Sequence, residues 1–410
     1  MAVVSPFKAL RPAAGLAAQV ASRPYDVLNS AEARVEAGSN PNSFLHITKS
    51  EIDLPASTDI HTQQVYDKAK ENLDNMIKNG ILVREEKACY YIYQLIMNGR
   101  SQTGLVCASS VNDYEKGIIK KHEFTRPEKE LDRINHIKTT GAQTGNVFLA
   151  YRNVSAIDSL VELWKNSHAP EYDFVAEDGI SHTIWIVNDD TVIATITNLF
   201  ATKVPCTYIA DGHHRAASAA KVRKALGKKA PAGADFFLTT LFPADELNIL
   251  DYNRVVKDLH GMEEDELISS LHDDFDVTSI GKEAYRPEQF HDFGMYLGGK
   301  WYKLTVRDDS YSDDPIGVLD VTILSKNILS KQFGIKDQRT DKRIDFVGGI
   351  RGLEELEKRV NSGEMAVAFS LYPVSIQQLF AIADEGEVMP PKSTWFEPKL
   401  RDGLLTHLLF

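Results

Sequence analysis

Apolar positions along the chain switch several times between a helical period and a strand-like run. Within 59–80 the apolar side chains recur every four positions, and the stretch ends in an Asn-Gly pair. This spacing predicts an amphipathic helix that stops at the glycine. The apolar run 88–97 is followed by Asn98-Gly99 and a second apolar stretch to Cys107, which predicts a β-hairpin.

The same two patterns predict the remaining elements. Helices are expected over 128–140, over 188–203, from about residue 212 to Gly227, and over 261–275, 319–333 and 375–386. In the first of them, Leu131, Ile134 and Ile137 are expected to face inward. Strands are expected over 184–187, 235–242, 247–256 and 366–373, with a second hairpin over 293–306. Such alternation predicts an α+β, mixed α/β architecture.

A change in character near residue 256 predicts two domains, 1–256 and 257–410. The second domain is the smaller and is expected to be α/β. The final stretch 388–404 contains three prolines and no periodicity, yet Trp395 and Phe396 are poor residues for a free end. We therefore expect it to be an ordered loop.

Composition narrows the functional classes. The chain has 410 residues and a formal net charge of -12, which argues against nucleic acid as a partner. Cys89, Cys107 and Cys206 form no CxxC pair, so no zinc site or disulfide framework is indicated. No stretch approaches the ~20 apolar residues of a membrane helix. A cytoplasmic protein without a membrane partner is expected, and its oligomeric state is left open.

Candidate chemistry concentrates where an apolar strand runs into an alanine-rich helix, within YIADGHHRAASAA at 208–220. The first N–H groups of a helix lack intrahelical partners and carry partial positive charge. Gly212 lets the backbone approach a ligand closely. Arg215 adds a planar donor fork suited to phosphate, and His213 and His214 can donate hydrogen bonds. Together they predict a phosphate site.

Asp211 at the same seam would repel a phosphate. It is better suited to hold Mg²⁺, to act as a base, or to brace a histidine. The structural alternative is a simple helix start, in which Asp211 is the N-cap and the histidines form a solvated first turn. Two histidines and an arginine are an unusual way to begin a helix whose dipole disfavours positive charge there, and this favours the functional interpretation.

The seam resembles the strand–turn–helix motif of the ParB/sulfiredoxin-like fold, in which such a turn binds nucleotide phosphates and some members are kinases of free serine. The whole chain resembles the domain of unknown function family 1015. That resemblance rests on five motifs: PFKALRP at 6–12, RPYDV at 23–27, KHEFTRPEKELDR at 121–133, ADGHHR at 210–215 and MPPKSTWFEPK at 389–399. It implies a ParB/sulfiredoxin-like phosphate-binding core with helical and hairpin insertions in the N-terminal domain.

Further candidates lie upstream. In the resembled fold the N-terminal region lies beside the phosphate turn and can supply the base, which makes Asp26 a candidate. Otherwise Asp26 caps a helix near Ala31. His122, Glu123 and Arg126 precede the predicted helix 128–140. They are candidates to bind substrate, with Glu123 or His122 as a base. The alternative for these charged residues is a solvated helix face.

Near the C-terminus, Lys392, Ser393 and Thr394 place a cation and two hydroxyls on a proline-stiffened loop. They are candidates to bind substrate if this tail reaches back over the phosphate site, and otherwise form a surface loop. Residues 294–300 satisfy GxxxxGK, but Trp301 stands where a P-loop needs Ser or Thr, so a hairpin is predicted there.

Together with the resemblance to a fold that includes free serine kinases, these residues imply a phosphotransfer enzyme acting on a small metabolite such as free serine. Gly212 and Arg215 would hold phosphates, and His213 would neutralise developing charge. Asp26 or Glu123 would take the hydroxyl proton, and Asp211 would hold Mg²⁺ with ATP or ADP. The partner is then a small phosphorylated metabolite or nucleotide. The alternative is a non-catalytic nucleotide-binding regulator of the ParB-like type.

Overall fold

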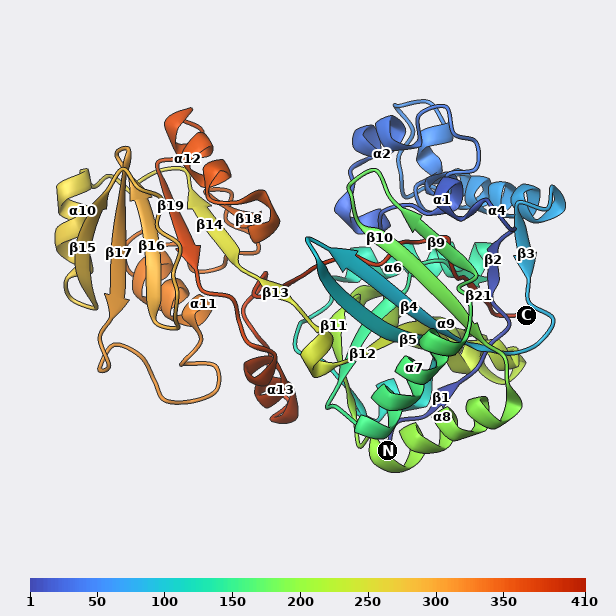
Figure 1. The fold of residues 1–410 in the computed structure, drawn as a ribbon. Helices are drawn as coiled ribbons and strands as arrows, with labels where there is room; N and C mark the ends of the chain where they lie inside the picture. The colour runs from blue at the N-terminus through green and yellow to red at the C-terminus, as the bar shows by residue number, and fades with distance from the viewer. The chain divides into compact units, whose positions relative to one another are not determined.

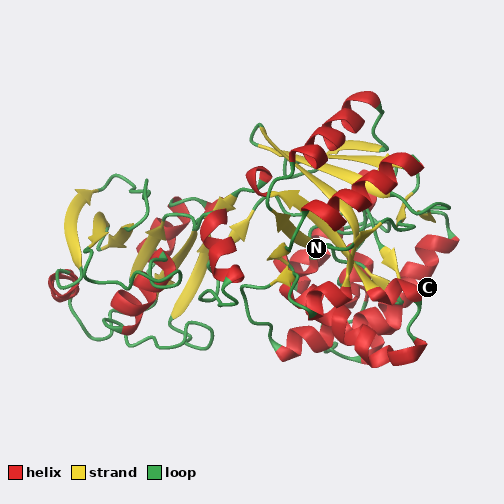
Figure 2. Ribbon diagram, turned by 90° about the horizontal axis from the view of Figure 1, so that it is seen from below, coloured by secondary structure: helices red, strands yellow, loops and turns green.

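The computed structural model describes residues 1–410, and the chain folds into two compact units (Figure 1). Unit 1 comprises residues 1–247 and 398–410, and unit 2 comprises residues 248–397. Both units mix helices and strands along the chain, as Figure 2 shows, so the mixed α/β architecture is confirmed. None of the helices combines the length and apolarity that a bilayer crossing requires.

Unit 1 contains most of the secondary structure. Its helices are α1 Ala17–Val20, α2 Ser30–Ala37, α3 Leu45–Thr48, α4 Gln63–Lys78, α5 Val111–Glu115, α6 Pro127–Thr140, α7 Ser155–Ser167, α8 Asp190–Lys203 and α9 His213–Leu226. Its strands are β1 Val4–Ser5, β2 Leu10–Pro12, β3 Leu82–Arg84, β4 Tyr90–Met97, β5 Arg100–Ser110, β6 Ile119–Lys120, β7 Ala142–Gln143, β8 Val147–Tyr151, β9 Tyr172–Val175, β10 Ser181–Val187, β11 Thr207–Asp211, β12 Phe236–Pro243 and β21 His407–Leu408.

A nine-stranded sheet organises unit 1 in the order β6-β11-β8-β12-β5-β4-β10-β9, with β1 paired to β5. β4 and β5 form the predicted hairpin, in which Asn98 and Gly99 adopt φ of 52° and 78°. β11, which leads into the Asp211-Gly212 seam, is antiparallel to β8 and parallel to β6. The seam therefore starts from a strand that is held on both sides.

Helix α6 packs against α9 and α4 and differs in one respect from its prediction. Leu131 was expected to face inward, but it is 57% exposed, whereas Ile137 is buried. The buried face of α6 instead contains Glu130, His136 and Thr140. Because polar groups occupy this face, apolar spacing alone could not locate it.

Unit 2 is built around a second sheet. Its elements are β13 Ile249–Leu250, β14 Tyr252–Val256, α10 Glu264–Leu271, β15 Phe275–Gly281, β16 Asp292–Leu297, β17 Lys300–Val306, α11 Asp320–Ile323 continued by a π-helical segment Leu324–Ser330, β18 Ile344–Gly348, α12 Glu354–Asn361, β19 Val367–Leu371, α13 Ile376–Asp384 and β20 Trp395–Phe396. Six strands pair antiparallel in the order β15-β17-β16-β19-β14-β18. Gly298 and Gly299, with φ of 55° and 76°, form the β16–β17 turn rather than a P-loop.

The unit boundaries differ from the expected division after residue 256. Strand β14 lies inside the sheet of unit 2, between β18 and β19. The last residues return to unit 1, where β21 pairs with β7 and the N–H of Leu10 donates to the carbonyl of Thr406 at 2.9 Å. Unit 2 is therefore an insertion in the chain of unit 1, which a local change in composition cannot reveal.

Candidate functional site at the Gly212 turn

The strand-to-helix turn is formed by a single glycine in the left-handed region. β11 ends at Asp211, Gly212 has φ 99° and ψ 29°, and α9 begins at His213. No side chain caps this helix start. Asp211 is thus not the N-cap that the structural alternative required. The uncapped N–H groups and the helix dipole create a site that favours an anion.

Arg215 is buried against this turn, with 8% of its surface exposed. Its Nη2 lies 3.4 Å from Asp26 Oδ2 and 3.5 Å from Asp211 Oδ2, and Nη1 donates to the carbonyl of Asn146. Burial alone would lower the pKa of Arg215, but the two carboxylates outweigh it, and the net effect is a raised pKa. A Cβ at Gly212 would lie 3.1 Å from the guanidinium carbon, so the glycine lets Arg215 pack against the turn.

Two features of the surroundings of Arg215 bear on ligand binding. Its Nε is buried and has no hydrogen-bond partner. Buried donors are rarely left unsatisfied. The structure also brings Asp26 to Arg215 at the turn, the position that the resemblance implied for it. Asp26 lies in the short 3-10 turn Tyr25–Val27 and does not cap α2, which Asn29 caps.

Lys399 ends the motif at 389–399, but it was not among the predicted site residues. Its Nζ donates to Asp211 Oδ2 at 3.2 Å. Burial would raise the pKa of Asp211, but Lys399 and Arg215 together hold it well below its ordinary value. Asp211 therefore stays ionised and positions two cations beside the helix start. Only the return of residues 398–410 to unit 1 brings Lys399 here.

His213 lies beside the segment that precedes α6. The backbone N–H of His122 donates to His213 Nε2 at 3.4 Å, and the two rings meet edge to face with centroids 4.5 Å apart. His213 Nδ1 is 3.9 Å from Glu123 Oε2. Burial, followed by the neighbouring His122, lowers the pKa of His213 well below 6.5. Since Nε2 accepts a hydrogen bond, the neutral ring carries its proton on Nδ1.

His214 makes the equivalent contact one residue later. Its Nε2 accepts from the backbone N–H of Arg126 at 3.0 Å. Burial lowers its pKa, so His214 is also neutral with a proton on Nδ1. The structure thus brings His122, Glu123 and Arg126 to the two histidines, although no sequence pattern indicated this pairing.

Asp402 lies on the same return segment and was also not indicated by the sequence patterns. Its backbone N–H donates to the carbonyl of Ser22 at 2.9 Å, which ties residues 398–410 to the chain just before Asp26. Burial raises the pKa of the Asp402 carboxyl to about 7, although Arg215 acts in the opposite direction. A carboxyl of this kind changes charge near neutral pH.

The pH dependence of stability offers a test of the histidine environment. Burial lowers the pKa of His122 to about 4. In the unfolded chain this imidazole has a pKa near 6.5, so below that pH the unfolded chain binds more protons than the folded chain. The contribution of His122 to the free energy of unfolding is therefore present at neutral pH and lost as the pH falls from about 6.5 toward 4. Between pH 7 and pH 5 the free energy of unfolding measured in urea should fall by about 2 kcal/mol more in the wild type than in His122→Gln.

The matched control for this measurement is His272→Gln, because His272 is exposed at the end of α10. The loss of stability between the two pH values should be the same in this variant as in the wild type. An equal loss in His122→Gln and His272→Gln would show that the buried ring is not the titrating group.

The remaining predicted residues lie in unit 2. Lys392 is exposed and has φ 58°, and Ser393 is buried, with its hydroxyl donating to the carbonyl of Pro390 at 2.6 Å. Thr394 follows in the same loop. Their expected role over the phosphate turn stays a prediction.

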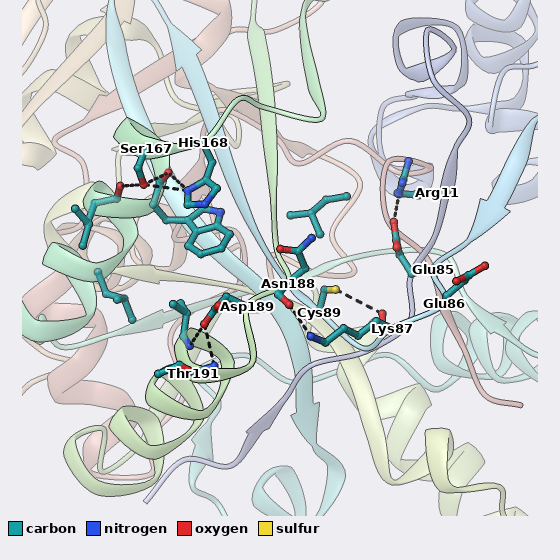
Figure 3. Close-up of a pocket in the computed structure, with 15 residues that line it drawn as sticks. Arg11, Glu85, Glu86, Lys87, Cys89, Ser167, His168, Asn188, Asp189 and Thr191 are labelled. Carbon is teal, nitrogen blue, oxygen red and sulfur yellow. Dashed lines mark hydrogen bonds and ion pairs between the residues drawn. The ribbon is translucent and has the colours of Figure 1, made fainter.

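A separate cavity of about 1080 Å³ occurs elsewhere in unit 1 (Figure 3). Figure 3 shows Arg11 directed at Glu85 on one side and Asp189 with Thr191 at the start of α8 on another. None of the residues predicted from the sequence to bind phosphate or substrate lines it. Cavity size therefore does not identify the Gly212 turn.

Metal-binding potential at the turn is limited. The structure brings together no group of three or more His, Cys, Asp or Glu side chains in a metal-holding arrangement. Magnesium is commonly held by one or two carboxylates together with substrate phosphates. Asp211 can be one such carboxylate, so the donor set fits a metal ion shared with a nucleotide rather than a resident one.

Comparison with known proteins gives a family and several distant structural neighbours. The family described as protein of unknown function (DUF1015) matches residues 4–322. No curated protein matches the chain in sequence.

Three solved structures are similar to part of the chain. A conserved hypothetical protein from Pyrococcus furiosus has 16% identity and a TM-score of 0.37, covering 75% of this chain and 97% of that chain. A free serine kinase in complex with AMP has 13% identity and a TM-score of 0.35, covering 74% and 91%. SbnI with C-terminal truncation from Staphylococcus aureus has 12% identity and a TM-score of 0.38, covering 74% and 87%. Scores this low carry no conclusion about activity.

Proposed function

We propose, for a chain that belongs to the DUF1015 family, that the Gly212 turn binds the phosphates of ATP or ADP and that unit 1 transfers phosphate to a small metabolite such as free serine. One observation carries the proposal. The uncapped start of α9 lies against the buried guanidinium of Arg215, whose Nε has no partner. A phosphate oxygen would satisfy both sets of donors.

The protonation states support this site. His213 and His214 are neutral, and each carries a proton on Nδ1 that it can donate without adding charge. Arg215 and Lys399 supply the positive charge, which Asp211 keeps at the turn. Donors fixed in this way need no reorganisation when negative charge develops on the transferred phosphoryl group.

The proposed transfer uses one of two carboxylates as the proton acceptor. The serine hydroxyl gives its proton to Asp26 or Glu123, and its oxygen attacks the terminal phosphorus of the nucleotide. The bond from that phosphorus to the bridging oxygen breaks, and ADP or AMP leaves with the negative charge near Arg215. Asp26 approaches Arg215 at 3.4 Å and Glu123 approaches His213 at 3.9 Å, so both border the turn. Magnesium, held by Asp211 and the phosphates, would offset phosphate charge.

Further parts of the proposal come from the sequence. Serine is the first acceptor to test because the seam resembles a fold that includes free serine kinases. A ParB/sulfiredoxin-like core in unit 1 and a substrate role for His122 and Arg126 belong to the same proposal, and so does a cytoplasmic location.

The proposal is tested by incubating the wild-type protein with serine, Mg²⁺ and either ATP or ADP. We expect phosphoserine together with ADP or AMP, detected by mass spectrometry. Binding of nucleotide without any transfer to serine or another hydroxyl metabolite would favour the non-catalytic regulator. Absence of both binding and transfer would refute the phosphate site itself.

A further inference from the structure

Arg254 is a fully buried cation in the sheet of unit 2, with no exposed surface. It lies on β14 between β18 and β19. Its Nη1 donates to the carbonyl of Tyr252, and Nη2 donates to the carbonyl of Pro391 at 3.2 Å. The remaining donor, Nε, is buried and has no partner.

No carboxylate balances this charge. The acid nearest in sequence, Asp251, receives hydrogen bonds from Arg286 Nη1 at 2.8 Å and from Asn253 at 2.6 Å. Carbonyl oxygens satisfy donors but do not neutralise a cation. Burial accordingly lowers the pKa of Arg254 to about 10. Buried charges in proteins are normally paired, because an unpaired one costs several kcal/mol.

A second cation, Lys392, lies beside the same aromatic ring as Arg254. Lys392 Nζ is 5.7 Å from the centre of the Tyr252 ring, and the Arg254 guanidinium carbon is 5.9 Å from the same centre. Lys392 adopts φ 58°, which is costly for a residue with a side chain and often marks a functional loop. The preceding residue, Pro391, accepts the hydrogen bond from Arg254 Nη2 through its carbonyl.

We infer that Arg254 and Lys392 form an anion-binding site in unit 2 that takes the phosphate or carboxylate group of a small molecule. The guanidinium fork presents two parallel donors that match either oxyanion. The anion would replace the Pro391 carbonyl as the acceptor of the Nη2 hydrogen bond, and it would accept a second hydrogen bond from Nε. The loop 390–394 would move outward to admit it. The hydroxyl of Ser393, which is bonded to Pro390, shapes the loop instead of contacting the ligand.

This site is independent of the Gly212 turn, so its test must separate the two. Equilibrium dialysis with radiolabelled inorganic phosphate counts the phosphates bound per full-length chain. We expect Arg254→Met and Lys392→Ala each to lose one bound phosphate relative to the wild type. Lys358→Ala, which removes an exposed lysine from α12 of the same unit, should lose none. Because only the difference is used, the result holds whether or not the Gly212 turn binds phosphate.

Thermal unfolding distinguishes a ligand site from a structural tether. In anion-free buffer Arg254→Met should melt no lower than the wild type, because it removes an unpaired buried charge. Adding phosphate should raise the melting temperature of the wild type more than that of Arg254→Met. If Lys392→Ala and Arg254→Met bind as much phosphate as the wild type, the inference is wrong. Displacement of labelled phosphate by excess acetate would identify the site as one for carboxylates as well.

Discussion

Replacing Arg215 with methionine should weaken ADP binding by about 1000-fold, because the variant loses a buried charge that two carboxylates hold against the helix start. Methionine fills similar space but offers no donor to a phosphate. The affected quantity is the dissociation constant from titration calorimetry. The variant should also unfold more easily, since Asp211 and Asp26 lose a partner, so its circular dichroism spectrum must be compared with that of the wild type.

Two further variants make this result specific. Arg223→Met removes another arginine of α9, one that pairs with Asp235, and should leave ADP affinity unchanged. Arg215→Lys keeps the charge but loses the planar fork, and it should fall between the wild type and Arg215→Met. An unchanged dissociation constant in a folded Arg215→Met protein would mean that nucleotide binds elsewhere.

Replacing Asp26 with asparagine should lower turnover by about 100-fold or more while ADP binds at least as tightly as before. The amide cannot accept a proton as a base, which accounts for the slower step. Removal of a negative charge 3.4 Å from Arg215 leaves that cation more available to phosphate. The measurements are the rate of phosphoserine formation and the dissociation constant of ADP.

Glu123→Gln is the paired variant, because Glu123 is the other carboxylate at the turn. The proposal requires one of the two variants to lose turnover with nucleotide binding retained. Full turnover in both would leave the serine hydroxyl without a proton acceptor and would contradict the proposed chemistry.

Local patterns in the sequence predicted several of the elements and the turn. The spacing of apolar residues predicted α4 and both hairpins, and the Asp-Gly-His-His-Arg seam predicted a strand-to-helix turn. These features depend on neighbouring residues, which is why they could be predicted. Leu131 was placed wrongly because the buried face of α6 is partly polar.

The partners of the turn depend on the packing of distant segments against one another. Lys399 and Asp402 reach it because residues 398–410 return to unit 1 after the whole of unit 2. Lys399 belongs to the motif at 389–399, but nothing in the local sequence of either residue places it beside the Gly212 turn. The protonation of His213 and His214 likewise follows from burial and from the backbone N–H groups of His122 and Arg126, which only the folded chain brings together.

Titration calorimetry of the wild-type protein with ADP is the sharpest test of whether the Gly212 turn binds the phosphates of a nucleotide. Adenosine, which has no phosphate, is the matched ligand, and Arg215→Met is the matched protein. We predict that ADP binds the wild type, that adenosine binds far more weakly, and that Arg215→Met loses the difference. Equal affinity for ADP and adenosine, or no binding of ADP at all, would contradict the claim.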